Sequence, residues 1–126
     1  MDIRKLQKAV ITALQDIKAV DIQAYDVKHL TSLFDRVVIA TANSARQAKS
    51  LARSVHDKAR EIGVRVYGLE GDDTGEWVLV DLGDMVVHIM LPAVRSHYNL
   101  EELWNQPKPR AQRKRSTRAR ISAEPK

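Results

Sequence analysis

The sequence contains no cysteine, which excludes disulfides, thiolate metal sites and cysteine nucleophiles. It also has no apolar run near the roughly 18 residues that a membrane-spanning helix requires. Residues 1–10 are charged and helically patterned, without the apolar stretch of a secretory signal peptide. These absences predict a cytoplasmic protein that does not contact a membrane.

What is present is enough for one domain with a real core, because the chain has 126 residues and 44% of them are hydrophobic. The net charge of +5 is divided unevenly along the chain. From residue 107 onward there are eight lysines and arginines and one glutamate, a net charge of +7. Residues 1–106 therefore carry −2, so a mildly acidic body precedes a strongly basic tail.

The basic tail has prolines at 107 and 109, dense charge and few apolar side chains, a composition that predicts disorder. We therefore divide the chain into a domain, 1–105, and a disordered tail, 106–126. A flexible basic segment attracts RNA phosphates by counterion release, without sequence preference. The alternative is a tail that serves only solubility. The residues expected to make such RNA contacts are Arg113, Lys114, Arg115, Arg118 and Arg120.

The first half of the chain has helical and strand spacings in turn. Residues 3–17 place apolar side chains at intervals of three and four, which predicts a helix. Residues 20–27 change toward alternation, which indicates a short strand. Residues 34–42 include a continuous apolar run, typical of a strand that is covered on both faces.

A second helix begins at a clear local signal. Ser44 and Gln47 form a capping box, an apolar helical face follows, and Gly63 stands where a glycine commonly ends a helix. Residues 64–69 are β-branched and aromatic, which predicts a strand. The order of all the predicted elements implies an α/β fold, with a mixed sheet of about five strands and helices packed on it.

Two strands, 77–82 and 85–91, should form a hairpin around a Gly83-Asp84 turn, where glycine accepts the positive φ of a type II′ turn. This turn fixes the cross-strand partners. One face of the hairpin is then entirely aliphatic and belongs to the core. The other face is mixed, with an aromatic residue, a carboxylate and an imidazole, as in a protein-binding surface. We expect Trp77 to be partly exposed there, and leave open whether His88 is a surface or a core residue. A helix that starts at Pro92 should close the domain.

Catalysis by a metal-dependent nucleotidyltransferase would need a glycine-serine turn and two carboxylates at alternate positions of the next strand. Here the turn reads Ala42-Asn43-Ser44, and residues 64–69 contain no carboxylate. The four histidines have no metal-ligand spacing. We therefore expect no enzyme activity, no metal and no cofactor.

Two charged segments have both a simple and a functional interpretation. Basic residues recur along the second helix, opposite its apolar face, and form either a solvated surface or a nucleic-acid contact. The loop 70–76 has four acidic residues. It is either a soluble turn or a surface that steers the body toward a basic protein.

Three segments resemble one known family. Residues 34–47, FDRVVIATANSARQ, resemble its pattern D-x-x-V-I-A-T-G-x-S-x-R-Q. Residues 70–71 and 77–88, EG and WVLVDLGDMVVH, are similar to its signature E-G…W-V-L-[LV]-D-L-G-D-[VI]-[VI]-V-H. Residues 95–104, RSHYNLEELW, resemble its closing segment. The family is that of the Iojap-like, or RsfS, ribosomal silencing factors.

The resemblance implies a nucleotidyltransferase-like fold without that activity. It implies binding to the large ribosomal subunit through ribosomal protein L fourteen, steric blockage of small-subunit joining, and repression of translation. It also implies a homodimer when the protein is free. The chain departs from the family at Ala42-Asn43, where the family has glycine, and the basic tail lies beyond the shared motifs.

Carried over to this chain, the resemblance places partner contact at one hairpin and on a few basic and aromatic residues near it. Trp77 would be the apolar anchor, and Asp81 and Asp84 would pair with lysine or arginine of the partner. The full set of expected contact residues is Trp77, Asp81, Leu82, Gly83, Asp84, Arg46, Arg95 and Tyr98.

Overall fold

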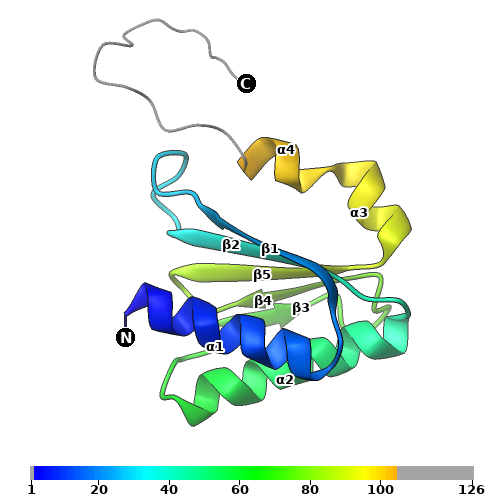
Figure 1. Cartoon of the computed structure of the whole chain (residues 1–126), viewed down its shortest axis with the longest axis horizontal. Coiled ribbons are helices and arrows are strands. Elements are labelled where there is room, and N and C mark those ends of the chain that lie inside the picture. The colour runs from blue at the N-terminus through cyan, green and yellow to red at the C-terminus, as the bar shows by residue number, and fades with distance from the viewer. Residues whose placement is uncertain (1, 105–126) are drawn as a thin grey trace, which may run out of the picture.

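Two amphipathic helices cover one face of a five-stranded sheet in the computed structural model, which describes residues 2–104 (Figure 1). Helix α1 (Ile3–Asp16) begins at Asp2, whose side chain accepts the Arg4 amide. Helix α2 (Ala45–Glu61) begins at Ser44, whose hydroxyl accepts the Gln47 amide at 3.1 Å. Gly63 lies just beyond α2 with a φ of +81°, as the sequence predicts for a glycine that ends a helix.

The sheet has strands β1 (Val20–Asp26), β2 (Arg36–Thr41), β3 (Gly68–Glu70), β4 (Trp77–Asp81) and β5 (Met85–Met90), in the spatial order β1-β2-β5-β4-β3. The central pair, β2 and β5, is parallel, and the other three pairings are antiparallel. This confirms the α/β fold with a mixed sheet. Helix α2 connects β2 to β3 across the two strands that lie between them (Figure 1).

The hairpin of β4 and β5 has the predicted register throughout, from Trp77 opposite Met90 to Asp81 opposite Val86. Gly83 has a φ of +85°, so the positive φ is confirmed. The Asp84 amide donates to the Leu82 carbonyl at 3.2 Å, which closes the turn over three residues. This bond joins residues two positions apart, whereas the type II′ turn that the sequence suggests has a bond between residues three positions apart.

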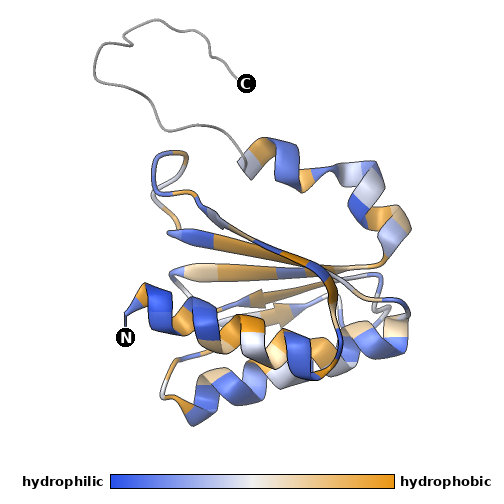
Figure 2. Cartoon of the chain, in the orientation of Figure 1, coloured by the Kyte–Doolittle hydropathy of each residue, from blue (hydrophilic) through white to orange (hydrophobic). Residues whose placement is uncertain are grey.

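The main core lies between the sheet and the α1/α2 layer. It contains the aliphatic face of the hairpin, with Val78, Val80, Val87 and Ile89 all fully buried. Figure 2 shows the hydrophilic residues on the outer sides of both helices. The prediction that this face of the hairpin belongs to the core is confirmed.

A second, smaller core lies on the opposite face of the sheet. Helices α3 (Pro92–Tyr98) and α4 (Leu100–Trp104) cover part of that face (Figure 1). Asn99 separates them because it adopts a left-handed conformation, with φ 49° and ψ 52°. The predicted closing helix is thus two short helices. The residues of the second core are Val27, Val37 and Ile39, with Tyr25, Leu30, Phe34, Leu100 and Trp104 packed against them.

The strand predicted for residues 64–69 is only partly right, since β3 begins at Gly68. Val64 and Val66 pack against the main core from irregular backbone instead. Their apolar, β-branched side chains gave the strand signal, but their burial does not require a paired strand. The predicted tail, 106–126, lies outside the described residues.

Candidate functional site

The mixed face of the hairpin lies on the side of the sheet away from α1 and α2, and its Val86 and Met90 are buried. Trp77, Leu79, Asp81 and His88 point to the side away from α1 and α2, and all four are half-buried. We call these four residues the hairpin face. The expectation that Trp77 is partly exposed is confirmed.

One end of the hairpin face is aromatic. The Trp77 indole Nε1 donates a hydrogen bond to Nδ1 of His88 at 2.9 Å. The Tyr98 ring, from the end of α3, lies 4.9 Å from the Trp77 ring between centroids and is 55% exposed. Because β4 and β5 are paired, Trp77 and His88 are diagonal neighbours, and this contact follows from the predicted register.

His88 is held neutral at this end. Burial lowers the pKa of its imidazole from 6.5 to about 4. A neutral ring keeps Nδ1 free to accept the indole hydrogen, whereas a protonated ring would present two donors. His88 therefore positions Trp77. Its side chain is half-buried, so it is neither a surface residue nor a fully buried core residue.

The other end of the hairpin face is acidic. The Asp81 carboxylate accepts the Gly83 amide at 2.9 Å, which fixes both the carboxylate and the turn. Asp84 is exposed, and its carbonyl accepts the amides of Asp35 and Arg36 at 2.8 and 3.1 Å. A side chain at Gly83 would meet the Tyr67 ring at 2.8 Å, so only glycine fits there without movement. The Asp81 carboxylate and the backbone of Asp84 are thus held in place at one corner, from which the Asp84 side chain is exposed.

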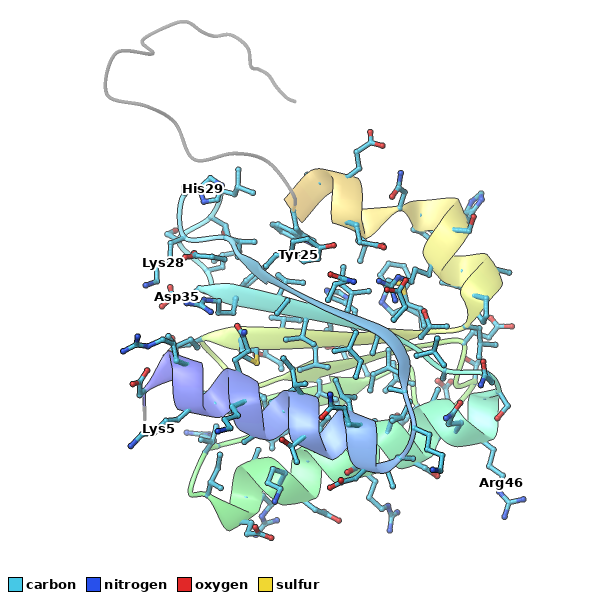
Figure 3. All side chains as sticks on the ribbon, viewed as in Figure 1. Lys5, Tyr25, Lys28, His29, Asp35 and Arg46 are labelled. Carbon is cyan, nitrogen blue, oxygen red and sulfur yellow. The ribbon has the colours of Figure 1, made fainter. Side chains whose placement is uncertain are left out.

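Three of the expected contact residues lie elsewhere. The Leu82 side chain is only 4% exposed and belongs to the main core. Arg95 is 7% exposed. Arg46 is exposed at the start of α2, on the opposite side of the sheet, and points away from the body (Figure 3). The hairpin residues and Tyr98 share one face, and Arg46 does not belong to it.

Arg95 instead connects three segments in the interior. Its Nη1 donates to the Asp21 carbonyl at 2.6 Å and to the Thr41 hydroxyl at 2.8 Å. Its Nε donates to the Glu101 carboxylate at 3.0 Å. The bulge at Asp21, which has a φ of +51°, aims its carbonyl at this guanidinium. No short-range signal in the sequence indicates these partners, because they lie 6 to 74 positions away.

Within residues 2–104, no three histidines, aspartates or glutamates gather closely enough to hold a metal ion. In the same part of the chain, no helix is both long and apolar enough to cross a membrane. What the hairpin face offers chemically is an aromatic anchor at one end and the fixed carboxylate of Asp81 at the other, with the exposed Asp84 beside it on the turn.

Comparison with known proteins gives consistent results. The family described as "Ribosomal silencing factor during starvation" (RsfS) matches residues 1–126, including those beyond the closing motif. The ribosomal silencing factor RsfS of Chromobacterium violaceum is 54% identical over 109 residues, covering 86% of this chain and 89% of that protein. The RsfS of Bacillus subtilis is 41% identical over 104 residues, covering 82% and 88%.

The fold agrees as well. A crystal structure of a Chromobacterium violaceum protein has a TM-score of 0.82 and 54% identity, covering 87% of this chain and 92% of that one. Organellar relatives are longer proteins. A chloroplast Iojap protein of Zea mays is 37% identical over 77% of this chain and 42% of its own length. A mouse protein named for mitochondrial assembly of the ribosomal large subunit is 31% identical over 75% and 43%.

Proposed function

Because the chain belongs to the family of ribosomal silencing factors, we propose that it binds the large ribosomal subunit through ribosomal protein L fourteen and blocks joining of the small subunit. The block is steric, represses translation and takes place in the cytoplasm, with no catalysis and no cofactor. The name of the mouse relative supports the choice of subunit. The resemblance to the family supports the choice of ribosomal protein.

The hairpin face is the surface that we assign to this contact. An aromatic side chain that is partly exposed but held in place can anchor an interface at little entropic cost, and Trp77 is held by His88 and Tyr98. Asp81 and Asp84 supply negative charge for a basic protein. Leu82 and Gly83 contribute to this contact through backbone only. Arg95 contributes by holding α3, which carries Tyr98.

The experiment is co-sedimentation with purified large subunits. Asp84→Lys should weaken binding at least about tenfold, because it places like charge against the basic partner. Asp16→Lys is the matched control, since Asp16 is also exposed but lies at the end of α1, outside the hairpin. Equal loss in both variants would show that net charge, and not the hairpin face, governs binding.

Trp77→Ala tests the aromatic end. It removes the anchor and should weaken co-sedimentation while the circular dichroism spectrum stays that of a folded protein. Near-wild-type co-sedimentation of this variant would remove Trp77 from the contact. Subunit joining, followed by light scattering, should recover in step with lost binding.

Two other functions are open to direct test. A metal-dependent nucleotidyltransferase would give heat and product on titration with nucleoside triphosphates and Mg²⁺, and that result would overturn the non-enzyme proposal. A general RNA-binding protein acting through its tail would lose all ribosome binding when the tail arginines and lysines are changed to glutamine. We expect instead a partial loss of affinity that grows at low salt.

Free copies should form a homodimer, as the family resemblance implies. Tyr98 and Leu103 are 55% and 50% exposed on the α3/α4 side, which gives apolar area for self-association. Sedimentation velocity at rising protein concentration measures the dimer directly.

A further inference from the structure

The described body carries opposite charges on its two sides. The helical layer, which comprises residues 2–18 and 45–61, has nine lysines and arginines against four acids, a net charge of +5. The remaining described residues have four basic and eleven acidic side chains, a net charge of −7. The net charge of −2 for the whole body is therefore the sum of a strongly basic region and a strongly acidic region. The hairpin face lies in the acidic region.

The cations at the start of α2 are not neutralised. Arg46, Lys49 and Arg53 are all exposed, and no described carboxylate forms an ion pair with any of them. Farther along the helix, Lys58 is paired with Glu61 at 3.2 Å. The three cations thus form an unscreened row, which we call the basic row.

The geometry of the basic row suits a phosphate backbone. Positions 46, 49 and 53 follow one side of the helix over roughly 10 Å, at about 1.5 Å per residue. They line a shallow hollow of about 1020 Å³ together with Ile17 and Ser50. Three acidic residues also line it: Glu61 is paired with Lys58 at 3.2 Å, Asp57 lies 3.1 Å from His56, and Asp72 comes from the loop after β3. Figure 3 shows Arg46 projecting outward from this side of the molecule.

The helical layer contains no phenylalanine, tyrosine or tryptophan. Proteins that bind single-stranded nucleic acid rely on aromatic side chains to stack the bases. The helical layer has no such side chains, so we do not assign single-strand binding to it. If two copies of the chain met through this surface, the cations of one would face the cations of the other and repel them. The apolar side chains of α2 are buried against the sheet and do not offer a protein interface.

We propose that Arg46, Lys49 and Arg53 bind the phosphate backbone of an RNA duplex, without sequence preference. The hairpin face then contacts protein while the opposite side of the body contacts RNA. Arg46, expected from the family resemblance to contact the protein partner, belongs to this second surface. The choice of RNA as the duplex rests on the proposed ribosomal function, whereas the phosphate contact itself does not.

The test uses the full chain and a short RNA duplex, with affinity measured by fluorescence anisotropy at several salt concentrations. The variant Lys49→Gln/Arg53→Gln removes two cations of the basic row. Because each phosphate contact contributes about 0.9 to the slope of log affinity against log salt, the slope should fall by about 2. The tail is unchanged in this variant, so its contribution stays constant.

The control is Lys28→Gln/Arg65→Gln, which removes the same charge from exposed positions outside the helical layer. It should leave the slope nearly unchanged. Equal slopes in both variants would overturn the proposal, as would tighter binding of the wild type to a single strand than to the duplex. All four side chains are exposed, so both variants should stay folded, with a small fall in unfolding temperature for the control because Arg65 lies 4.9 Å from the centroid of the Tyr67 ring.

Large-subunit co-sedimentation of the same variants separates this proposal from the proposed function. A wild-type chain that fails to co-sediment would refute ribosome binding and leave the duplex result intact. A duplex slope that does not respond to the basic row would refute the RNA contact and leave the hairpin face intact. An equal response with a DNA duplex would support phosphate recognition and remove any preference for RNA.

Discussion

Arg95 is the residue that fixes the C-terminal helices to the sheet. One guanidinium joins the β1 bulge, the end of β2 and Glu101 of α4 through the hydrogen bonds described above. Its planar fork of donors can reach all three acceptors at once, which an ammonium group cannot. The family resemblance led us to expect Arg95 in partner contact, and the sequence does not indicate its interior partners because they are distant in the chain.

Arg95→Lys keeps the charge and should lower the free energy of unfolding by about 2–4 kcal/mol, because at least one buried acceptor is left unpaired. Urea unfolding monitored by circular dichroism measures this. A loss below about 0.5 kcal/mol, the usual range for surface substitutions, would show that the hydrogen bonds add little.

His88 gives stability a defined pH dependence. The unfolded chain takes up a proton near pH 6.5, whereas burial lowers the pKa of His88 in the folded protein to about 4. The contribution is therefore fully present above pH 6.5 and is lost as the pH falls toward about 4. The difference between these pKa values corresponds to at most about 3 kcal/mol.

His88→Gln keeps an acceptor for the Trp77 indole but does not titrate, so it should flatten the fall in stability between pH 6.5 and 4. The matched control is His97→Gln, because His97 is exposed. Urea midpoints at a series of pH values provide the measurement. An unchanged slope in His88→Gln would assign the effect to other groups.

At the scale of elements, Gln47 does more than its capping box predicts. Its Oε1 accepts the amide of Asn43, the residue before the capping Ser44, at 2.6 Å, whereas a capping box would have it accept the Ser44 amide. Its Nε2 also donates to the carbonyls of Ile17 and Lys18, at 3.0 and 3.2 Å. The side chain thus ties the end of α1 to the start of α2, a contact between residues about 30 positions apart.

Gln47→Glu separates the two roles by the sign of its effect. As a pure cap, glutamate should be neutral or stabilise by up to about 1 kcal/mol through the helix dipole. As a tie between helices, it loses two donors and faces two carbonyl oxygens, and should destabilise by about 1–3 kcal/mol. We expect destabilisation, greater than in Gln47→Ala, measured as the shift in urea midpoint.

The sequence predicts individual elements well where a local signal defines both ends. The capping serine, the glycine after α2 and the register of the β4–β5 hairpin all match the structure. It fails at residues 64–67, where Val64 and Val66 are partly buried against the core but the backbone does not form a strand. Periodicity reports which side chains are buried, but the pairing of backbone depends on a neighbour elsewhere in the chain.

At the scale of the whole molecule, the order of the strands in the sheet could not be predicted from the sequence. The pattern at residues 37–40 predicted a strand covered on both faces, and β2 is indeed an interior strand with a core on each side. That its neighbour is β5 depends on the packing of α2 and on where the chain returns. The segregation of charge was hidden for the same reason, because it appears only when the fold separates the helical layer from the hairpin.

The central position of the β2–β5 pair determines when the domain can assemble. These strands lie side by side, yet residues 42–84 separate them in the chain. During synthesis, which proceeds at about 5–20 residues per second, β2 emerges seconds before the strand that completes it. Until Met85–Met90 has left the ribosome, β1 and β2 can pair only with each other, and the other edge of β2 lacks its partner. The pairing that completes the centre of the sheet therefore forms only after most of the domain has been synthesised, and until then the free edge of β2 is open to pairing with another chain.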